Sequence, residues 1–180
     1  GTLFEQQNEN SFVIRPEEKA DWSQVFHSLS RLGADNGFQI VYCNEHAQPF
    51  NGPLEDVSYS GVKGLFHAIQ VITKEGYLRN TKITIVTKDV QDLELREKQN
   101  LAGSMIWGFA KTVSIEYPEI YGGIVDVDDA AMENDKLLAS LLGVESQESV
   151  VRGQTRYIAR LISHKDYLKQ NKESDKKIEI

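Results

Sequence analysis

The chain has 180 residues, of which 40% are hydrophobic and 26% are charged, and its formal net charge is -7 at pH 7. Because attraction to phosphates needs an electropositive surface, this charge excludes a general nucleic-acid binder. A chain of this length is expected to form one domain that buries roughly 70% of its unfolded surface. Its apolar runs are shorter than the roughly 20 residues of a membrane span, and residues 1–10 lack a signal-peptide pattern, so we expect a cytoplasmic protein without membrane contact.

Cysteine occurs once, as Cys43 within the apolar run QIVYCNE. A single cysteine excludes an internal disulfide. At such a position a small buried side chain is favoured over a reactive thiol, and a reducing setting fits it. We therefore expect Cys43 to lie in the core.

The first part of the chain is predicted to hold a hairpin and a helix. Residues 2–15 contain two short strand-like segments separated by the polar turn Asn8–Asn10. A helix then begins at Pro16–Glu18, because proline and acidic side chains are favoured in a first turn, and it ends at Gly33. Its packed face is expected to consist of Trp22, Val25, Phe26, Leu29 and Leu32.

The middle of the chain alternates between strand and helix. Residues 38–43 form a compact apolar run, the pattern of a buried parallel strand, and residues 81–87 are rich in β-branched side chains. Between them lie a loop with two prolines, at 47–56, and a long helix that ends at Gly76. The apolar face of this helix is expected to consist of Val57, Val62, Leu65, Phe66, Ile69 and Ile72.

Residues 105–128 show the strongest pattern. A helix is predicted that opens at about Asn100 and ends before Pro118, because proline cannot continue a helix interior. The pair Gly122–Gly123 then permits a sharp reversal, and residues 124–127 form a short buried strand. The apolar face of the helix is Ile106, Phe109, Ala110 and Val113, at offsets of three, four and seven.

The remaining residues predict one short helix and two strands. The helix spans residues 134–142 and is capped by Asn134. Residues 149–163 are extended in character, with Gly153 as a turn or bulge between two strands. The residues after 165 are polar and rich in lysine and acid, which is typical of a linker.

This alternation predicts an α/β fold with a mainly parallel sheet flanked by helices. Such a sheet binds a dinucleotide only with a glycine-rich turn, and neither Gly-x-Gly-x-x-Gly nor Thr-Gly-x-x-x-Gly-x-Gly follows a predicted strand. The pairs Gly33 with Gly37 and Gly61 with Gly64 lie after or inside a helix. Backbone N–H groups therefore cannot approach a pyrophosphate, and we expect no cofactor-binding residue in this chain.

Tyr59 and Lys63 stand at the Tyr-x-x-x-Lys spacing that short-chain dehydrogenases use. At this spacing an ammonium can lower the pKa of a phenol so that it gives a proton to a carbonyl. The match lacks an upstream serine at the usual distance and a nucleotide loop. We therefore interpret the pair as surface residues of a helix and assign no catalytic residue.

Metal ligands are not recognisable in the sequence either. The four histidines, His27, His46, His67 and His164, are isolated from further ligands, and His67 is expected at the edge of the core. Three acids, Asp126, Asp128 and Asp129, follow or end a predicted strand and are of a type that binds metals. Solvation of the strand end or capping of the next helix is the favoured alternative for them.

Residues 105–128 also carry a family resemblance. The order Trp-Gly-x-x-Lys, Glu-x-Pro and Gly-Gly-Ile-Val-Asp resembles the structural subdomain of ketoreductases in modular polyketide synthases. Residues 148–161 are similar to the family's following segment, and residues 11–26 resemble the start of this subdomain in synthases with separately encoded acyltransferases. The matching residues of the central motif are Trp107, Gly108, Lys111, Glu116, Pro118, Gly122, Gly123, Val125 and Asp126.

The resemblance implies a function for the chain. These ketoreductases hold two subdomains in tandem, a truncated Rossmann-like structural one without cofactor and a catalytic one, related to short-chain dehydrogenases, with the nucleotide loop. Residues 1–165 would be the structural subdomain and residues 166–180 a linker. The implied partners are the catalytic subdomain, which reduces β-keto thioesters on acyl carrier protein with NADPH, and other synthase domains.

Two alternatives remain open from the residues alone. The chain could be a pseudo-ketoreductase half that serves as a scaffold for another synthase domain, or a small reductase that uses Tyr59 and Lys63. For the structural subdomain we expect an exposed apolar patch larger than a few hundred Å². Trp107, Phe109 and Tyr157 are predicted to lie in the interface, with core packing as the alternative for Trp107.

Overall fold

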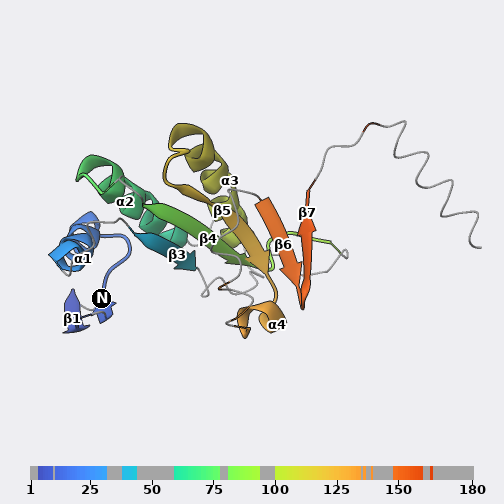
Figure 1. The fold of residues 1–180 in the computed structure, drawn as a ribbon, viewed down its shortest axis with the longest axis horizontal. Helices are drawn as coiled ribbons and strands as arrows, with labels where there is room; N and C mark the ends of the chain where they lie inside the picture. Colours follow the sequence, from blue (N-terminus) through green and yellow to red (C-terminus); the bar gives the residue numbers. More distant parts are fainter. Residues whose placement is uncertain are drawn as a thin grey trace, which may run out of the picture.

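A computed structural model describes residues 4–9, 11–31, 38–43, 59–77, 81–93, 100–134, 136, 139, 148–159 and 163. Figure 1 shows a small N-terminal hairpin beside a main sheet with helices packed on it. The hairpin consists of β1, Glu5–Asn8, and β2, Ser11–Val13, which pair antiparallel as predicted. No helix among the described residues is long and apolar enough to cross a bilayer.

Helix α1, Lys19–Arg31, is bound by several hydrogen bonds to Arg15, in the segment that follows the hairpin. The Asp21 carboxylate accepts from the Arg15 backbone N–H at 2.9 Å and from its guanidinium at 3.0 and 2.7 Å. Asp21 lies in the first turn, where an acidic group also meets the positive end of the helix dipole. The helix start predicted at Pro16–Glu18 is wrong, because these residues form a turn that places Arg15 next to Asp21.

The main sheet has five strands in the order β3-β4-β5-β6-β7, of which the first four are parallel and β7 is antiparallel to β6. The mainly parallel α/β fold predicted from the alternation is confirmed. Gly153, with φ of 58°, makes the turn between the last two strands, as expected. The strands are β3, Gln39–Cys43; β4, Lys82–Lys88; β5, Tyr121–Val127; β6, Glu148–Arg152; and β7, Thr155–Ile158.

Helices α2, Ser60–Lys74, and α3, Leu101–Glu116, lie side by side over one face of this sheet (Figure 1). Gly76 ends α2 with φ of 90°, as predicted. Helix α3 opens at Asn100, as predicted, and the Asn100 side chain caps it. The main core lies between these helices and the sheet. Its fully buried members include Leu65, Ile72, Ile83, Ile85, Ile106, Ile124 and Val113.

A smaller cluster lies on the opposite face of the sheet, where α4, Asp129–Met132, packs on β6 (Figure 1). Val86, Val125 and Val151 contribute to it because neighbouring strand residues point to opposite faces. The helix predicted at 134–142 and the boundary predicted after residue 165 fall mostly or wholly outside the described residues. Residues 136 and 139, which are described within the predicted range, are helical, and α4 ends before Asn134.

Three local predictions are wrong because of where the residues lie in the sheet or on the helix. β3 lies at the edge of the described sheet and alternates in burial, so Cys43 is exposed rather than buried. Phe66 lies on the outer side of α2 and is 42% exposed. The pair Gly122–Gly123 does not reverse the chain but lies inside β5, where it forms a bulge opposite Ile83 and Thr84.

Glycine is required at this bulge. A Cβ on Gly122 would lie 2.9 Å from Thr84 Oγ1 and 3.1 Å from the Ile83 carbonyl oxygen, and Gly123 has φ of 116°. The sharp turn predicted here lies instead at residues 118–120, just after α3. The bulge shifts the register of β5 relative to β4 by one residue. After the bulge, Val125 and Asp126 point to opposite faces of the sheet.

Candidate functional site

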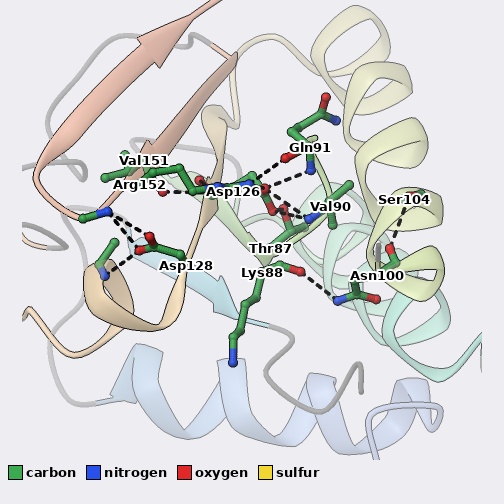
Figure 2. A network of polar contacts seen from close by, with 12 residues as sticks. Thr87, Lys88, Val90, Gln91, Asn100, Ser104, Asp126, Asp128, Val151 and Arg152 are labelled. Carbon is green, nitrogen blue, oxygen red and sulfur yellow. Dashed lines mark hydrogen bonds and ion pairs between the residues drawn. The ribbon is translucent and has the colours of Figure 1, made fainter. Parts of the chain in front are cut away.

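The carboxyl ends of β4, β5 and β6 meet at one edge of the sheet, which is where parallel α/β folds place their ligands. In this chain that edge holds a closed polar network (Figure 2). Its centre is Asp126, whose side chain is fully buried near the end of β5. A buried carboxylate is stable only when it is paired and hydrogen-bonded, so its partners define the site.

Four groups donate hydrogen bonds to the Asp126 carboxylate. The Thr87 hydroxyl donates at 2.8 Å, and the backbone N–H groups of Val90 and Gln91 donate at 3.0–3.1 Å and 3.0 Å. The guanidinium of Arg152 lies 2.7 Å from Oδ2 and neutralises the charge. Removing either partner of such a buried ion pair leaves an uncompensated charge, at a cost of about 3–5 kcal/mol.

Arg152 is held independently of the ion pair. Its guanidinium donates to the backbone carbonyl of Gln91 at 2.7 Å, to that of Val151 at 3.0 Å and to that of Asp126 at 3.3 Å. These bonds join β6 to the loop that follows β4. The network therefore connects three neighbouring strand ends that are far apart in sequence (Figure 2).

The loop after β4 is also fixed to the start of α3. Asp89 has φ of 52°, a left-handed conformation that asparagine and aspartate adopt more readily than most residues. Its carbonyl accepts from the Asn100 N–H at 2.9 Å. The Asn100 amide donates to the Lys88 carbonyl at 2.9 Å, and its Oδ1 accepts from the Gly103 N–H at 2.9 Å. Asn100 alone thus both caps α3 and binds the loop that follows β4.

Asp128 confirms the capping interpretation. Asp128 accepts from the Ala131 N–H at 2.9 Å, which caps α4, and from the Gly153 N–H at 2.9 Å, which holds the β6–β7 turn. Asp129 forms an ion pair with Lys88. For Asp126 both alternatives are wrong, because its carboxylate is buried against Arg152. Among the described residues there is no group of three or more acidic, histidine or cysteine side chains placed to hold a metal.

The arrangement has a chemical consequence. The backbone N–H groups of Val90 and Gln91 are the kind of donors that hold phosphates in nucleotide-binding loops. Here both groups are bound to the chain's own carboxylate, and the guanidinium beside them is neutralised by the same group. This edge of the sheet therefore acts as a structural clamp among the residues described.

Tyr59 and Lys63 lie one helical turn apart at the start of α2. Tyr59 is the residue before α2 and is 56% exposed. The Lys63 ammonium lies 3.0 Å from Glu17 Oε2 in an exposed ion pair that ties α2 to the turn before α1. The interpretation of both residues as surface residues is consistent with these positions.

A second feature is an apolar groove between α2 and α3. Its volume is about 270 Å³, and its walls include Phe66, Phe109 and Tyr117, with Lys74 and Glu116 among the polar lining residues. Phe66 and Phe109 pack edge to face, with ring centroids 6.1 Å apart. The predicted interface residue Phe109 therefore lies in the wall of an open apolar groove.

The outer side of α3 carries an exposed glycine and an exposed isoleucine. Gly108 is exposed, and a Cβ placed on it would meet nothing within 4 Å. Ile115, about two turns further along the helix, is 76% exposed. An exposed glycine in the middle of a helix lowers the stability of the helix by about 0.8–1.0 kcal/mol relative to alanine. No packing contact within the described chain requires a glycine at this position.

The other two predicted interface residues lie elsewhere. Trp107 is 8% exposed and belongs to the main core, which is the packing alternative, so it offers little area to a partner. Tyr157 lies on β7 and is 44% exposed. The role of all three residues in an interface stays a prediction.

Arg152 is a residue of this site that was not predicted from the sequence. The available signal was an acid inside an apolar strand, Asp126 in GGIVDV, followed by an arginine in the next apolar strand. Such charges are rarely buried unless they are paired. Thr87 and the loop N–H groups carry no signal of their own, because their role depends on the register between β4 and β5.

Comparison with known proteins shows the family of the chain. The family described as beta-ketoacyl synthase-like, N-terminal, matches residues 1–145. A curated relative, one of the phenolphthiocerol/phthiocerol polyketide synthase subunits of Mycobacterium tuberculosis, is 28% identical over 139 residues. That match covers 72% of this chain and 8% of the relative, so the chain spans less than a tenth of that synthase.

Solved structures show the same fold. The first ketoreductase of the tylosin polyketide synthase has a TM-score of 0.59 at 18% identity, over 84% of this chain and 32% of that one. A multidomain structure with adenylation, ketoreductase and pseudo-Asub domains of a keto acid-selecting NRPS module has a TM-score of 0.69 at 18% identity, over 88% of this chain and 14% of that one. The resemblance to polyketide synthase ketoreductases is confirmed. The chain belongs to the beta-ketoacyl synthase-like, N-terminal family and is a polyketide-synthase-associated domain with the Rossmann-like fold of ketoreductases.

Proposed function

We propose that this chain is the noncatalytic structural subdomain of a polyketide synthase ketoreductase. Its function would be to pack against the catalytic subdomain, which binds NADPH and reduces β-keto thioesters carried on acyl carrier protein. The observation that carries this proposal is the apolar groove between α2 and α3, together with the exposed Gly108 and Ile115 beside it. A glycine without a packing role inside the chain suits close approach by a partner from outside.

The polar clamp supports the noncatalytic part of the proposal. Val90 and Gln91 direct their N–H groups to Asp126, so these donors are not free for a pyrophosphate. Lys63 is engaged by Glu17. NADPH is therefore expected to bind the partner and not this chain.

The direct test measures binding of the chain to a separately produced catalytic subdomain. Phe66→Asp and Ile115→Asp each place a charge on the proposed surface without entering the core, because both side chains are substantially exposed. At the centre of an interface, such a change costs about 1–3 kcal/mol, which is roughly a tenfold to hundredfold rise in Kd. Isothermal titration calorimetry gives the Kd of each variant.

Gln24→Asp is the matched control, because it adds the same charge at an exposed position of α1. Its Kd is expected to stay within about twofold of the unmodified chain. Equal affinity for all three variants would place the partner on another surface, and the interface proposal would then be wrong. Binding of NADPH to this chain alone at micromolar concentration, followed by nucleotide fluorescence, would instead favour the small-reductase alternative.

A further inference from the structure

The donors around Asp126 form a complete carboxylate-binding site. One guanidinium, one hydroxyl and two backbone N–H groups converge on the two oxygens at 2.7–3.1 Å. A single positive charge faces a single negative charge, and the pair is buried. In composition and geometry this is a receptor for a small monoanion, already occupied by a side chain of the same protein (Figure 2).

We propose that Asp126 fills a built anion site as a tethered ligand, and that shortening it to alanine opens that site to a free monocarboxylate of the size of formate. This network lies at the sheet edge, away from the groove between α2 and α3, so what it binds does not depend on the role of the chain as a structural subdomain.

The receptor keeps its shape without the aspartate carboxylate. Arg152 is held by the backbone carbonyls of Gln91, Val151 and Asp126, which remain in an alanine variant. Val90 and Gln91 follow Asp89, whose N–H donates to the Val127 carbonyl at 3.1 Å and whose carbonyl accepts from the Asn100 N–H at the start of α3. The donors are therefore fixed by contacts other than their contact with the anion.

The site selects by size and charge. Replacing Asp126 by alanine removes only the carboxylate group, so the vacated volume fits formate and not a larger carboxylate such as pivalate. A phosphate dianion would bring a second negative charge against one guanidinium in a buried position, which is costly. Formate supplies the planar pair of oxygens that the guanidinium and the N–H groups already bind.

The experiment follows thermal unfolding of the full chain carrying Asp126→Ala in sodium formate and in sodium chloride at equal ionic strength. At a formate concentration ten times the dissociation constant, a rise in Tm of about 3–6 °C over chloride is expected. Pivalate at the same concentration is expected to give less than about 1 °C, roughly the scatter of such an assay. A rise no larger in formate than in chloride would overturn the proposal.

Asp126→Asn is the matched control, since it removes the charge but keeps the site filled. Formate is expected to leave its Tm unchanged relative to chloride, and an equal rise in both variants would show a general salt effect and overturn the proposal. If the alanine variant does not fold in chloride, it is refolded from denaturant in both salts. Recovery of folded protein in formate alone supports the proposal, and failure in formate as well refutes it.

Discussion

Two glycines of α3 provide a matched test of how the loop after β4 packs on this helix. Gly103 lies near its start, and a Cβ added there would be 2.3 Å from Val90 Cγ2 and 3.1 Å from Asn100 Nδ2. Gly108 lies near its middle, and a Cβ there would meet nothing within 4 Å. The same substitution, glycine to alanine, is therefore expected to have opposite effects on stability at the two positions.

The size of each effect follows from these contacts. Val90 is buried and its N–H is bound to Asp126, so it cannot move without disturbing the clamp. Overpacking of this kind costs about 1–3 kcal/mol, and the helix propensity of alanine returns at most about 1 kcal/mol. Gly103→Ala should therefore lower the free energy of unfolding by about 1–2 kcal/mol. Gly108→Ala should raise it by about 0.5–1 kcal/mol, because only the propensity term applies.

Urea unfolding followed by circular dichroism measures both variants, and unchanged m-values would show that the difference lies in stability. Adding Val90→Ala to Gly103→Ala removes the clashing methyl group, so the two losses should be clearly less than additive. Two results would refute the reasoning: stabilisation by both alanines, or additive losses in the double variant. If Gly108 also serves a partner, Gly108→Ala should weaken binding to the catalytic subdomain while it stabilises the free chain.

Three further predictions concern titration and turnover. Hydrogen bonds from Arg15 lower the pKa of Asp21 below the unfolded value of about 3.9, so the stability of this pair is present above about pH 4 and is lost as the pH falls further. Asp21→Asn should flatten the fall in Tm between about pH 5 and pH 2, and an unchanged slope would contradict the assignment. Burial raises the pKa of both Tyr42 and Tyr121 to about 12, so these tyrosines should ionise in ultraviolet titration well after the exposed ones at about 10, and stability should fall as the pH rises through that interval. Tyr59→Phe in a complete ketoreductase should keep turnover within about threefold, whereas a loss of about a hundredfold would show that its hydroxyl is catalytic.

The elements with strong local signals could be predicted from the sequence. The helix ending before Pro118 and the strand 81–87 were recognised because side-chain periodicity, β-branching and proline act within a few residues. Gly76 and Gly153 were placed correctly because both adopt positive φ, which glycine tolerates at no steric cost. These are properties of short segments, so they can be recognised without knowing which elements lie next to one another.

Features that depend on neighbours could not be predicted. Residues 38–43 have the composition of a buried strand, but the strand lies at the edge of the described sheet, and Cys43 is exposed as a result. Phe66 lies at helical spacing with buried residues. This spacing does not show how much of the helix surface is covered by neighbouring elements. The clamp joins Asp126 to Arg152 across 26 residues, and only the register of three strands brings them together.

The order of the described strands has a consequence for engineering. Each parallel connection steps to the next neighbour in one direction, from β3 to β6, and the winding never turns back among these strands. In open sheets of this class a ligand crevice forms where the strand order reverses. A glycine-rich loop grafted after β4 would therefore place phosphate donors at a point where the order of the described strands does not reverse. If the chain itself binds no coenzyme, as we propose, turning it into a coenzyme binder would take a new strand on the outer side of β3, connected by a helix on the opposite face.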